Sequence, residues 1–448
     1  MDSKKTLENR DGFNSKWGFI LACIGSAVGM GNIWRFPVMV SQFGGMTFLI
    51  PYFLFVILIA STGVIEEMAL GRSAQAGPIG AFGYCCKIRG KNKKIGEDFA
   101  LIPVLGSLAL AIGYTVVVGW IFKYTYMALV GQIANLGTDM NNIASVFSSI
   151  AVSFGNNMWL IIAMIVSFII MALGVADGIE KANKFMMPTL FVLFIGLGIY
   201  IATLDGATHG YTYIFTIDPE KIKDPLLWIF AFGQAFFSLS IAGNGTVIYG
   251  SYLSKKEDVV SAAKNVAFYD TIAALLATLV IVPAIAVGGS KLDVGGPGLM
   301  FIYLVNVFNR MPGGTIVGII FYICVLFAGV SSLINLYETS VATLQEQLGM
   351  KRINSVVLIG IIGVIVAILI QGIIEPWMDA VSIYVCPLGA GLAGIFFFWI
   401  GGKSYAEESV NEGSNKKIGS WFVILGKYVY IPLTIVALIA GAVLNGIG

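Results

Sequence analysis

The feature that most constrains this sequence is a polar interruption inside its first apolar segment. From Trp17 to Val40 the chain is apolar for long enough to cross a bilayer. The centre of this segment, residues 25–37, reads G-S-A-V-G-M-G-N-I-W-R-F-P. Each glycine destabilises a helix interior by roughly 1 kcal/mol relative to alanine, so these glycines favour a break. Backbone groups freed by a break inside a membrane have no water to bond, so a break persists only where a polar ligand or water is bound.

Close packing of helices is the alternative explanation for these glycines, because small residues let membrane helices approach each other. Packing does not account for Asn32 and Arg35 on the same segment. Polar groups at membrane depth are usually functional. We therefore interpret residues 25–37 as part of a binding site.

The composition indicates a polytopic membrane protein. Of its 448 residues, 57% are hydrophobic and only 12% are charged, far from the values of soluble domains. The net charge of +2 gives no indication of a nucleic-acid partner, and we expect none. The five cysteines have no metal-binding or disulfide spacing, and the single histidine, His209, lies in a polar connection. Residues 1–16 are polar and do not resemble a cleavable signal peptide.

Apolar windows of about twenty residues predict eleven transmembrane helices. They cover residues 17–39, 45–70, 100–129, 158–175, 184–204, 226–250, 260–288, 314–345, 354–373, 378–400 and 421–445. Twenty lysines and arginines lie in the connections on the N-terminal side, and four lie on the other side. The positive-inside rule therefore predicts a plasma-membrane protein with a cytoplasmic N-terminus and an extracellular C-terminus. Residues 139–157 and 288–314 are then external loops, and the second is long enough to contain short helices.

The sixth apolar segment repeats the interruption of the first, with Gly243, Asn244 and Gly245 in its centre. Two glycine-interrupted segments five spans apart predict an all-α fold with a five-plus-five inverted repeat, in which the two broken helices meet near the membrane midplane. Helix ends freed there offer N–H groups to an anion and carbonyls to a small cation. The predicted parts are a cytoplasmic N-terminal segment (1–16), a first repeat with helices 1–5 (17–204), a second repeat with helices 6–10 (205–400), and a cytoplasmic loop with helix 11 (401–448).

These motifs resemble those of the neurotransmitter:sodium symporter family, in its bacterial amino-acid branch. The resemblance covers nearly the whole chain and rests on residues 25–37, on G-Q-A-F-F-S-L-S at 233–240 and on F-A-G-V-S-S at 327–332. It implies a leucine-transporter-type fold that carries an amino acid with sodium by alternating access. The family commonly has twelve spans. The difference of one span affects only peripheral packing or oligomer contacts, since spans 1–10 form the core.

The resemblance implies two sodium sites, whose oxygen ligands suit a hard cation. The first consists of the substrate carboxylate, the carbonyl of Ala27 and the side chains of Asn32, Ser238 and Asp270. The second consists of the carbonyls of Gly25, Val28 and Ala328 and the hydroxyls of Ser331 and Ser332. From the residues alone, the two serines are equally consistent with hydroxyls that bond the carbonyls of the preceding turn.

The resemblance also implies a substrate site. The N–H groups of Met30 and Gly31 and the hydroxyl of Tyr114 bind the substrate carboxylate, and carbonyls near Ser240 bind the ammonium group. Alone, Tyr114 is also consistent with an interfacial or packing tyrosine. The complete predicted set is Ala27, Gly29, Met30, Gly31, Leu110, Tyr114, Phe237, Ser238, Ser240, Gly243, Ser332 and Leu336.

Two positions in this set indicate the substrate class. Gly29 stands where monoamine carriers of the family have an aspartate, which implies a substrate that brings its own carboxylate. Gly243 stands where leucine-type members have a phenylalanine, and a glycine opens that wall of the pocket. With the apolar walls formed by Leu110, Phe237 and Leu336, this implies a bulky hydrophobic, aromatic amino acid.

The resemblance implies two gates. Arg35 and Asp379 form the outer pair, with Phe237 as a lid over the substrate. Arg10 and Glu346 form the cytoplasmic pair, supported by Phe13, Ser251 and Tyr252. As an alternative, Arg10 and Glu346 are ordinary surface charges, which contribute under about 1 kcal/mol when paired.

The fifth span carries a further resemblance. Gly178 and Pro188 enclose nine residues, a spacing similar to a Gly-X9-Pro motif of the family, which implies that the cytoplasmic end of this helix unwinds. A proline kink with no role in transport is the alternative.

Chloride is not expected to be required. Tyr52, Gln234 and Ser238 retain part of the chloride site of chloride-dependent members, but Ala274 replaces a serine of that site. Asp270, one turn earlier on the same helix face, supplies a built-in negative charge. The predicted ions are therefore two sodium ions.

Other functional classes fit less well. A membrane enzyme requires a nucleophile with its base, or a metal constellation, and the sequence shows neither. An ion channel does not require two opposed charged pairs around a midplane site. A proton-coupled transporter of the same fold, with Asp270 as its proton site, is the principal alternative.

Overall fold

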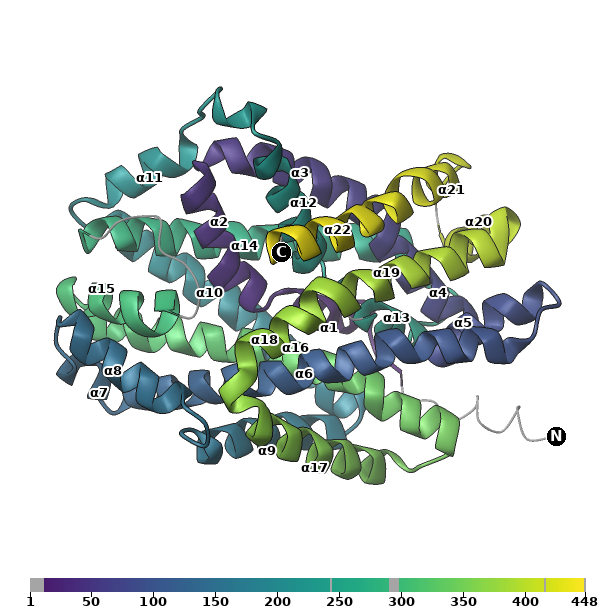
Figure 1. Cartoon of the computed structure of the whole chain (residues 1–448), viewed down its shortest axis with the longest axis horizontal. Helices are drawn as coiled ribbons and strands as arrows, with labels where there is room; N and C mark the ends of the chain where they lie inside the picture. Colours follow the sequence, from purple (N-terminus) through teal and green to yellow (C-terminus); the bar gives the residue numbers. More distant parts are fainter. Residues whose placement is uncertain (1–11, 242–243, 290–297, 415, 447–448) are drawn as a thin grey trace.

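The computed structural model describes residues 12–241, 244–289, 298–414 and 416–446. All regular secondary structure in these residues is helical. Long helices run side by side along one axis (Figure 1). The short helices α5 (Pro78–Ile88) and α20 (Gly402–Asn411) lie at one end of this axis, and α8 (Met140–Ala151) and α11 (Ala207–Phe215) lie at the other.

The elements of the first five predicted spans follow in chain order. They are α1 (Lys16–Ala27) with η1 (Gly31–Arg35) and α2 (Phe36–Phe43); α3 (Met46–Ile59) with η2 (Ala60–Val64) and α4 (Ile65–Ala74); α6 (Lys93–Leu129); α9 (Asn157–Ala172); and η3 (Val175–Glu180) with α10 (Lys181–Ala202).

The remaining six spans follow. They are α12 (Pro225–Ser238) with α13 (Gly245–Ser251); α14 (Val259–Val287); α16 (Gly314–Leu348); α17 (Arg352–Ile370); α18 (Ile374–Asp379), η8 (Ala380–Val385), α19 (Cys386–Gly394) and η9 (Ile395–Gly401); and α21 (Trp421–Leu425), η10 (Gly426–Tyr430) and α22 (Ile431–Leu444). Each predicted span therefore corresponds to a helix or to a run of helices.

The connections carry short helices as well. They are α7 (Gln132–Asn135), η4 (Lys221–Lys223), η6 (Leu299–Tyr303), α15 (Leu304–Arg310) and η7 (Gln371–Ile373). The short helices expected within residues 288–314 are present as η6 and α15. Within the cytoplasmic loop predicted to begin at residue 401, residues 402–411 form helix α20, which follows the tenth span.

Both predicted helix breaks are present. The helix that ends at Ala27 and the helix that resumes at Gly31 are bent by 56°. Val28 has an extended backbone (φ −72°, ψ 96°), which ends α1. In the sixth span, α12 ends at Ser238 and α13 begins at Gly245. Asn244 there has a positive φ of 51°, a conformation that asparagine tolerates better than most residues.

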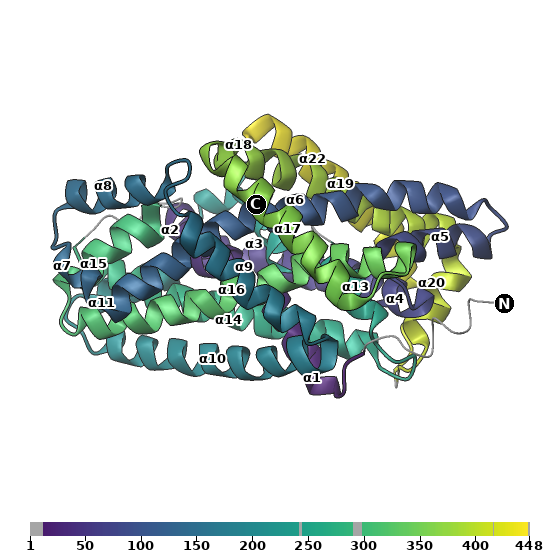
Figure 2. The same ribbon diagram turned by 90° about the horizontal axis from the view of Figure 1, so that it is seen from below.

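The two breaks lie within a frame of long helices. α1 packs against α10, α14 and α16, and α16 packs along α6. Figure 2 shows α10 along one side of the molecule with α1 beside its end. The frame thereby brings the carbonyl end of α1 next to α14 and α16, where Asp270, Ser331 and Ser332 are located.

Candidate functional site

A cavity lies between the two helix breaks. It is lined by Ser26, Ala27, Gly29, Gly31, Asn32, Leu110, Tyr114, Phe237, Ser238, Ser240, Gly245, Ser332, Asn335 and Leu336. Of the predicted substrate residues, Met30 is not among those that line it. Gly243 lies outside the described residues. The structure thus brings the rest of the predicted substrate set together around one space.

A cluster of buried polar side chains forms the floor of this cavity. The Asn32 amide nitrogen donates to Ser238 Oγ at 3.0 Å and to Asp270 Oδ1 at 2.8 Å, and Ser238 Oγ donates to Asp270 Oδ2 at 2.7 Å. All three side chains are almost completely buried. The predicted side chains of the first sodium site are therefore in mutual contact, from the first, sixth and seventh spans.

The charge of this cluster suits a cation. In the described part of the chain, the hydrogen-bond partners of Asp270 are the neutral side chains of Asn32 and Ser238, and no lysine or arginine pairs with it. A buried carboxylate without a positive partner is strongly disfavoured. Carboxylate and hydroxyl oxygens beside a helix carbonyl end are also ligands that a hard cation prefers, and the Asn32 amide oxygen accepts from the Gly29 N–H at 3.1 Å.

The residues predicted for the second sodium site meet where α1 ends against α16. Ser332 Oγ lies 3.3 Å from the carbonyl oxygen of Gly25 and 3.4 Å from that of Val28. Ser331 Oγ lies 3.1 Å from the carbonyl oxygen of Ala328. The last carbonyls of a helix have no intrahelical partner, so this arrangement offers converging oxygen atoms to a small cation.

Asn183 on α10 is a polar neighbour of this second site that the sequence analysis missed. Its side chain is fully buried, and its Oδ1 has no hydrogen-bond partner. A Cβ atom on Gly25 would lie 2.0 Å from this Oδ1, so only glycine permits the approach. The Asn183 amide nitrogen donates to the carbonyl of Ile179. The sequence offers no signal for Asn183, because it belongs to no recognised motif. Hydropathy shows only that a polar residue interrupts the apolar run of the fifth span.

The opposite wall of the cavity is suited to a carboxylate. The Tyr114 hydroxyl approaches the backbone N–H of Met30. A Cβ atom on Gly29 would lie 2.7 Å from Ser332 Oγ and 3.6 Å from the Tyr114 hydroxyl. Any side chain at position 29 would therefore clash with the Ser332 hydroxyl, so the close approach of α16 to this position requires glycine.

The rest of the cavity is mainly apolar. Leu110, Phe237 and Leu336 line it as predicted. Asn335 also lines it, which the sequence analysis did not predict, and its amide nitrogen donates to the carbonyl of Gly245 at 3.3 Å. Its position on α16 is one residue before Leu336, so the helical register is the signal that could have identified it.

The outer charged pair is not in direct contact. Arg35 is partly buried and its Nε has no hydrogen-bond partner, whereas Asp379 is exposed. Asp379 acts on Arg35 electrostatically, but the described residues contain no ion pair between them. On the other side of the cavity, both carboxyl oxygens of Glu346 accept from the Gly77 N–H at 3.0 Å. The predicted partner Arg10 lies outside the described residues.

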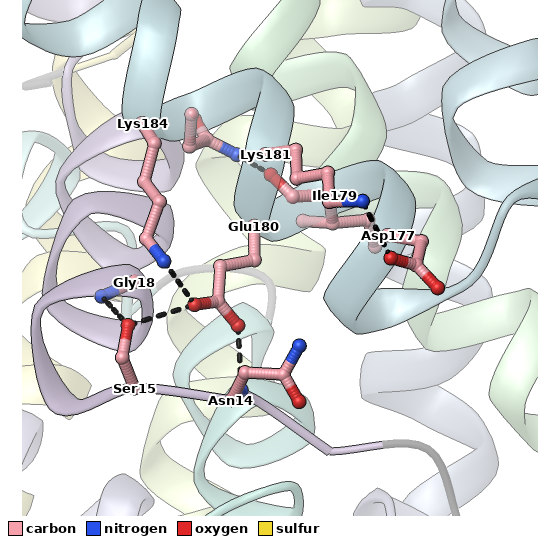
Figure 3. A network of polar contacts seen from close by, with 9 residues as sticks. Asn14, Ser15, Gly18, Asp177, Ile179, Glu180, Lys181 and Lys184 are labelled. Carbon is pink, nitrogen blue, oxygen red and sulfur yellow. Dashed lines mark hydrogen bonds and ion pairs between the residues drawn. The ribbon is translucent and has the colours of Figure 1, made fainter.

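At this end of the molecule, Glu180 joins the start of α1 to the fifth span (Figure 3). Its carboxylate accepts from the Asn14 N–H at 2.6 Å and from Ser15 Oγ at 2.8 Å, and it pairs with Lys184 at 2.6 Å. Ser15 in turn caps α1 by accepting from the Gly18 N–H. Residues 175–202, which contain Gly178 and Pro188, are helical throughout, so unwinding of this helix stays a prediction.

Comparisons with known proteins agree with this geometry. The model of the Sodium:neurotransmitter symporter family matches residues 10–136 and 138–445. An uncharacterized sodium-dependent transporter of Haemophilus influenzae is 33% identical over 359 residues, which cover 78% of this chain and 77% of that protein. One of Methanocaldococcus jannaschii is 29% identical over 456 residues, which cover 96% of this chain and 90% of that protein.

A solved structure is similar over almost the whole chain. The crystal structure of MhsT in complex with L-phenylalanine has a TM-score of 0.83 and 31% sequence identity, and the match covers 96% of this chain and all of that one. The human sodium-dependent neutral amino acid transporter SLC6A17 is 28% identical over 308 residues, which cover 63% of this chain and 41% of that protein.

The Glu180 contacts generate a prediction about opening at this end. We expect Glu180→Gln to release the start of α1, because hydrogen bonds to a charged group typically contribute about 1.5–3 kcal/mol each. Cys23 on α1 is buried, so its reaction with a thiol reagent reports this release. Labelling of Cys23, followed by mass spectrometry, should become several-fold faster in Glu180→Gln than in the wild type.

Asp177→Asn is the matched control. Asp177 pairs with Lys181 at 2.7 Å one turn earlier, but the two side chains are 70% and 67% exposed. Such exposed pairs contribute under about 1 kcal/mol, so labelling should stay at the wild-type rate. Equal labelling of Cys23 in the wild type and Glu180→Gln would contradict the role of Glu180.

Proposed function

We propose, from the premise that the chain belongs to the sodium:neurotransmitter symporter family, that it carries hydrophobic, preferentially aromatic L-amino acids into the cell. It is a sodium-dependent symporter rather than an enzyme. The cavity lined by Gly29, Tyr114 and Ser332 is the observation that carries the proposal. It accepts a carboxylate beside the buried cluster of Asn32, Ser238 and Asp270.

The substrate is proposed to bind groups at both helix breaks. Its carboxylate would bond the N–H groups of Met30 and Gly31 and the Tyr114 hydroxyl, and it would complete the first sodium site. Carbonyls near Ser240, at the end of α12, would accept from its ammonium group. Charge-assisted bonds of this kind are the strong ones, and they fix the orientation of the α-amino acid group whatever the side chain is.

The side chain of the substrate would lie among Leu110, Phe237 and Leu336, which form an apolar wall. The MhsT structure is a complex with L-phenylalanine, and its likeness to this chain supports an aromatic preference. Gly243, as a residue without a side chain, would enlarge this part of the pocket.

We propose two sodium ions per cycle, one at Ala27, Asn32, Ser238 and Asp270 and one at Gly25, Val28, Ala328, Ser331 and Ser332. Alternating access would require Arg35 and Asp379 to approach each other when the outer side closes, with Phe237 over the substrate. Release of sodium to the cytoplasm would follow unwinding between Gly178 and Pro188. Arg10 with Glu346 would close that side, for a protein with a cytoplasmic N-terminus and an extracellular C-terminus.

Chloride would be unnecessary because the anion is part of the chain. The Tyr52 hydroxyl donates to Ser238 Oγ at 3.5 Å, and Ser238 donates to Asp270. A carboxylate about 4 Å from sodium contributes on the order of 4 kcal/mol at an effective dielectric of 20. A second anion beside Asp270 would be repelled.

Uptake into proteoliposomes tests the proposed function. Tryptophan, tyrosine and leucine should compete for uptake, whereas glycine and glutamate should not, and replacement of sodium with choline under a clamped pH gradient should abolish uptake. Undiminished uptake in choline would contradict sodium coupling. Strong competition by glutamate with none by tryptophan would contradict the proposed substrate class.

Ser331→Ala tests the second sodium site. Loss of one charge-assisted oxygen contact of about 1.5 kcal/mol should raise the sodium concentration for half-maximal uptake about tenfold or more. Thr343→Ala is the matched control, because its hydroxyl bonds the Thr339 carbonyl on the same helix at 2.8 Å, away from the cavity. An equal change in both variants would show that Ser331 acts only on the helix.

Asp270→Asn tests the origin of chloride independence. Wild-type uptake should be the same in chloride and in gluconate, because the carboxylate already neutralises part of the sodium charge. Asp270→Asn should transport faster in chloride than in gluconate, or lose transport in gluconate only. A wild type that needs chloride, or a variant that is active to the same degree in both buffers, would contradict the account.

A further inference from the structure

Glu66 is a buried acid that the transport site does not use. It lies in the first turn of α4, its side chain is fully buried, and neither carboxyl oxygen has a hydrogen-bond partner among the residues that the structure describes. An ionised carboxylate in such a place costs several kcal/mol unless a counter-charge or hydrogen bonds compensate for it. A neutral carboxylic acid avoids most of that cost.

The neighbouring Glu67 has the partners that Glu66 lacks. Asn244 Nδ2 donates to Glu67 Oε1 at 3.2 Å, and the backbone N–H groups of Thr246 and Val247 also face its carboxylate. These contacts favour the ionised form of Glu67. The two neighbouring carboxyl groups also oppose each other's ionisation.

Tyr430 on η10 faces Glu66 across the contact between the second and eleventh spans. A Cβ atom on Gly63 would lie 2.6 Å from the Tyr430 hydroxyl, and Gly63 is one turn before Glu66 on the same face of the helix. The Tyr430 hydroxyl is buried and has no hydrogen-bond partner. Both sides of this contact are π-helical, η2 on one and η10 on the other, and π-helical segments are frequent at functional sites.

No cation compensates for Glu66 in the described part of the chain. The groups that interact with it electrostatically are Glu67, Tyr430 and Cys85. Three more titratable groups lie on elements packed against α4: Tyr405 on α20, Tyr249 on α13 and Asp270 on α14. The Tyr405 hydroxyl lies 2.5 Å from Ser73 Oγ, and Asp270 belongs to the cluster described above. The buried arginine on α4, Arg72, donates to the carbonyls of Glu257 and Ser409 instead.

The surroundings of Glu66 favour a bound proton over a bound metal ion. At the second sodium site, Ser332 Oγ lies within 3.4 Å of the carbonyl oxygens of Gly25 and Val28. Around Glu66, neither carboxyl oxygen has a donor or hydroxyl within hydrogen-bond distance. The described residues also contain no group of three or more histidine, cysteine, aspartate or glutamate side chains that could hold a metal ion, whereas a proton requires only one carboxyl oxygen.

We propose that Glu66 is a proton-binding site, which holds a proton while the contact between η2 and η10 is closed and exchanges it with water when the contact opens. Loading forms an O–H bond between one carboxyl oxygen and a proton from water, and release returns that proton to water and leaves a carboxylate. Glu66 is eight residues, or about 12 Å of helix, from the end of α4 at Ala74. In the orientation proposed above, the water is cytoplasmic.

Infrared spectroscopy of the purified protein tests the protonation directly. At neutral pH an exposed glutamate is ionised, so the carbonyl band of a protonated carboxylic acid reports a buried one. We expect this band in the wild type and in Glu67→Gln, and its loss in Glu66→Gln. A wild type without the band, or a band that persists in Glu66→Gln, overturns the proposal. Loss of the band in Asp270→Asn instead would assign the proton to Asp270 and would also overturn it.

The pH dependence of uptake tests whether the proton is exchanged during transport. Because closing the contact requires protonation, wild-type uptake should fall about twofold or more as the pH on the cytoplasmic face rises from 7 to 9. Glu66→Gln, or Glu66→Leu if the glutamine variant does not fold, should remove this fall while sodium dependence is retained. An unchanged pH profile in the folded variant contradicts the exchange step, and it leaves sodium-coupled uptake itself unaffected.

Discussion

Oxygen atoms without a positive partner, gathered where two helices break inside the molecule, are the constraint on which this structure depends. Asp270 is completely buried and bonded only to neutral groups, and the carbonyls of Gly25 and Val28 lie against Ser332. Such groups are costly to bury. We propose that the breaks are stable in an apolar protein because a cation and an α-amino acid together satisfy the groups that the breaks release.

The breaks also divide the molecule into parts with different freedom to move. α6 and α16 pack along each other and form a continuous wall of the cavity. α1 is held at its start by Glu180 and at its end by contacts with α16. Asn183 lies one turn from Glu180 on the fifth span and reaches Gly25. Any change in the helical winding of residues 175–183 would therefore move both ends of α1, which links the proposed second sodium site to the contacts of Glu180.

Much of this arrangement could be predicted from the sequence, because breaks and polar residues stand out against apolar spans. The glycines at 25–31, the asparagine at 32 and the serines at 331 and 332 had visible signals. Contacts that depend on how two helices are rotated against each other had no visible signal in the sequence. Asn183, Asn335 and Glu66 each lie in an otherwise ordinary apolar stretch, and only packing shows that each side chain is buried. The outer pair, Arg35 and Asp379, was visible in the sequence, but a matched motif does not predict whether the two side chains are in contact in one conformation.

The central claim is that the carboxylate of the substrate completes the first sodium site. Binding of phenylalanine and of its decarboxylated amine to the purified protein, measured by calorimetry with and without sodium, tests this claim most directly. If the carboxylate is a ligand of sodium, sodium should strengthen the binding of phenylalanine at least about tenfold, or about 1.4 kcal/mol, and should not strengthen the binding of the amine. Equal sodium dependence for the two compounds would contradict the account.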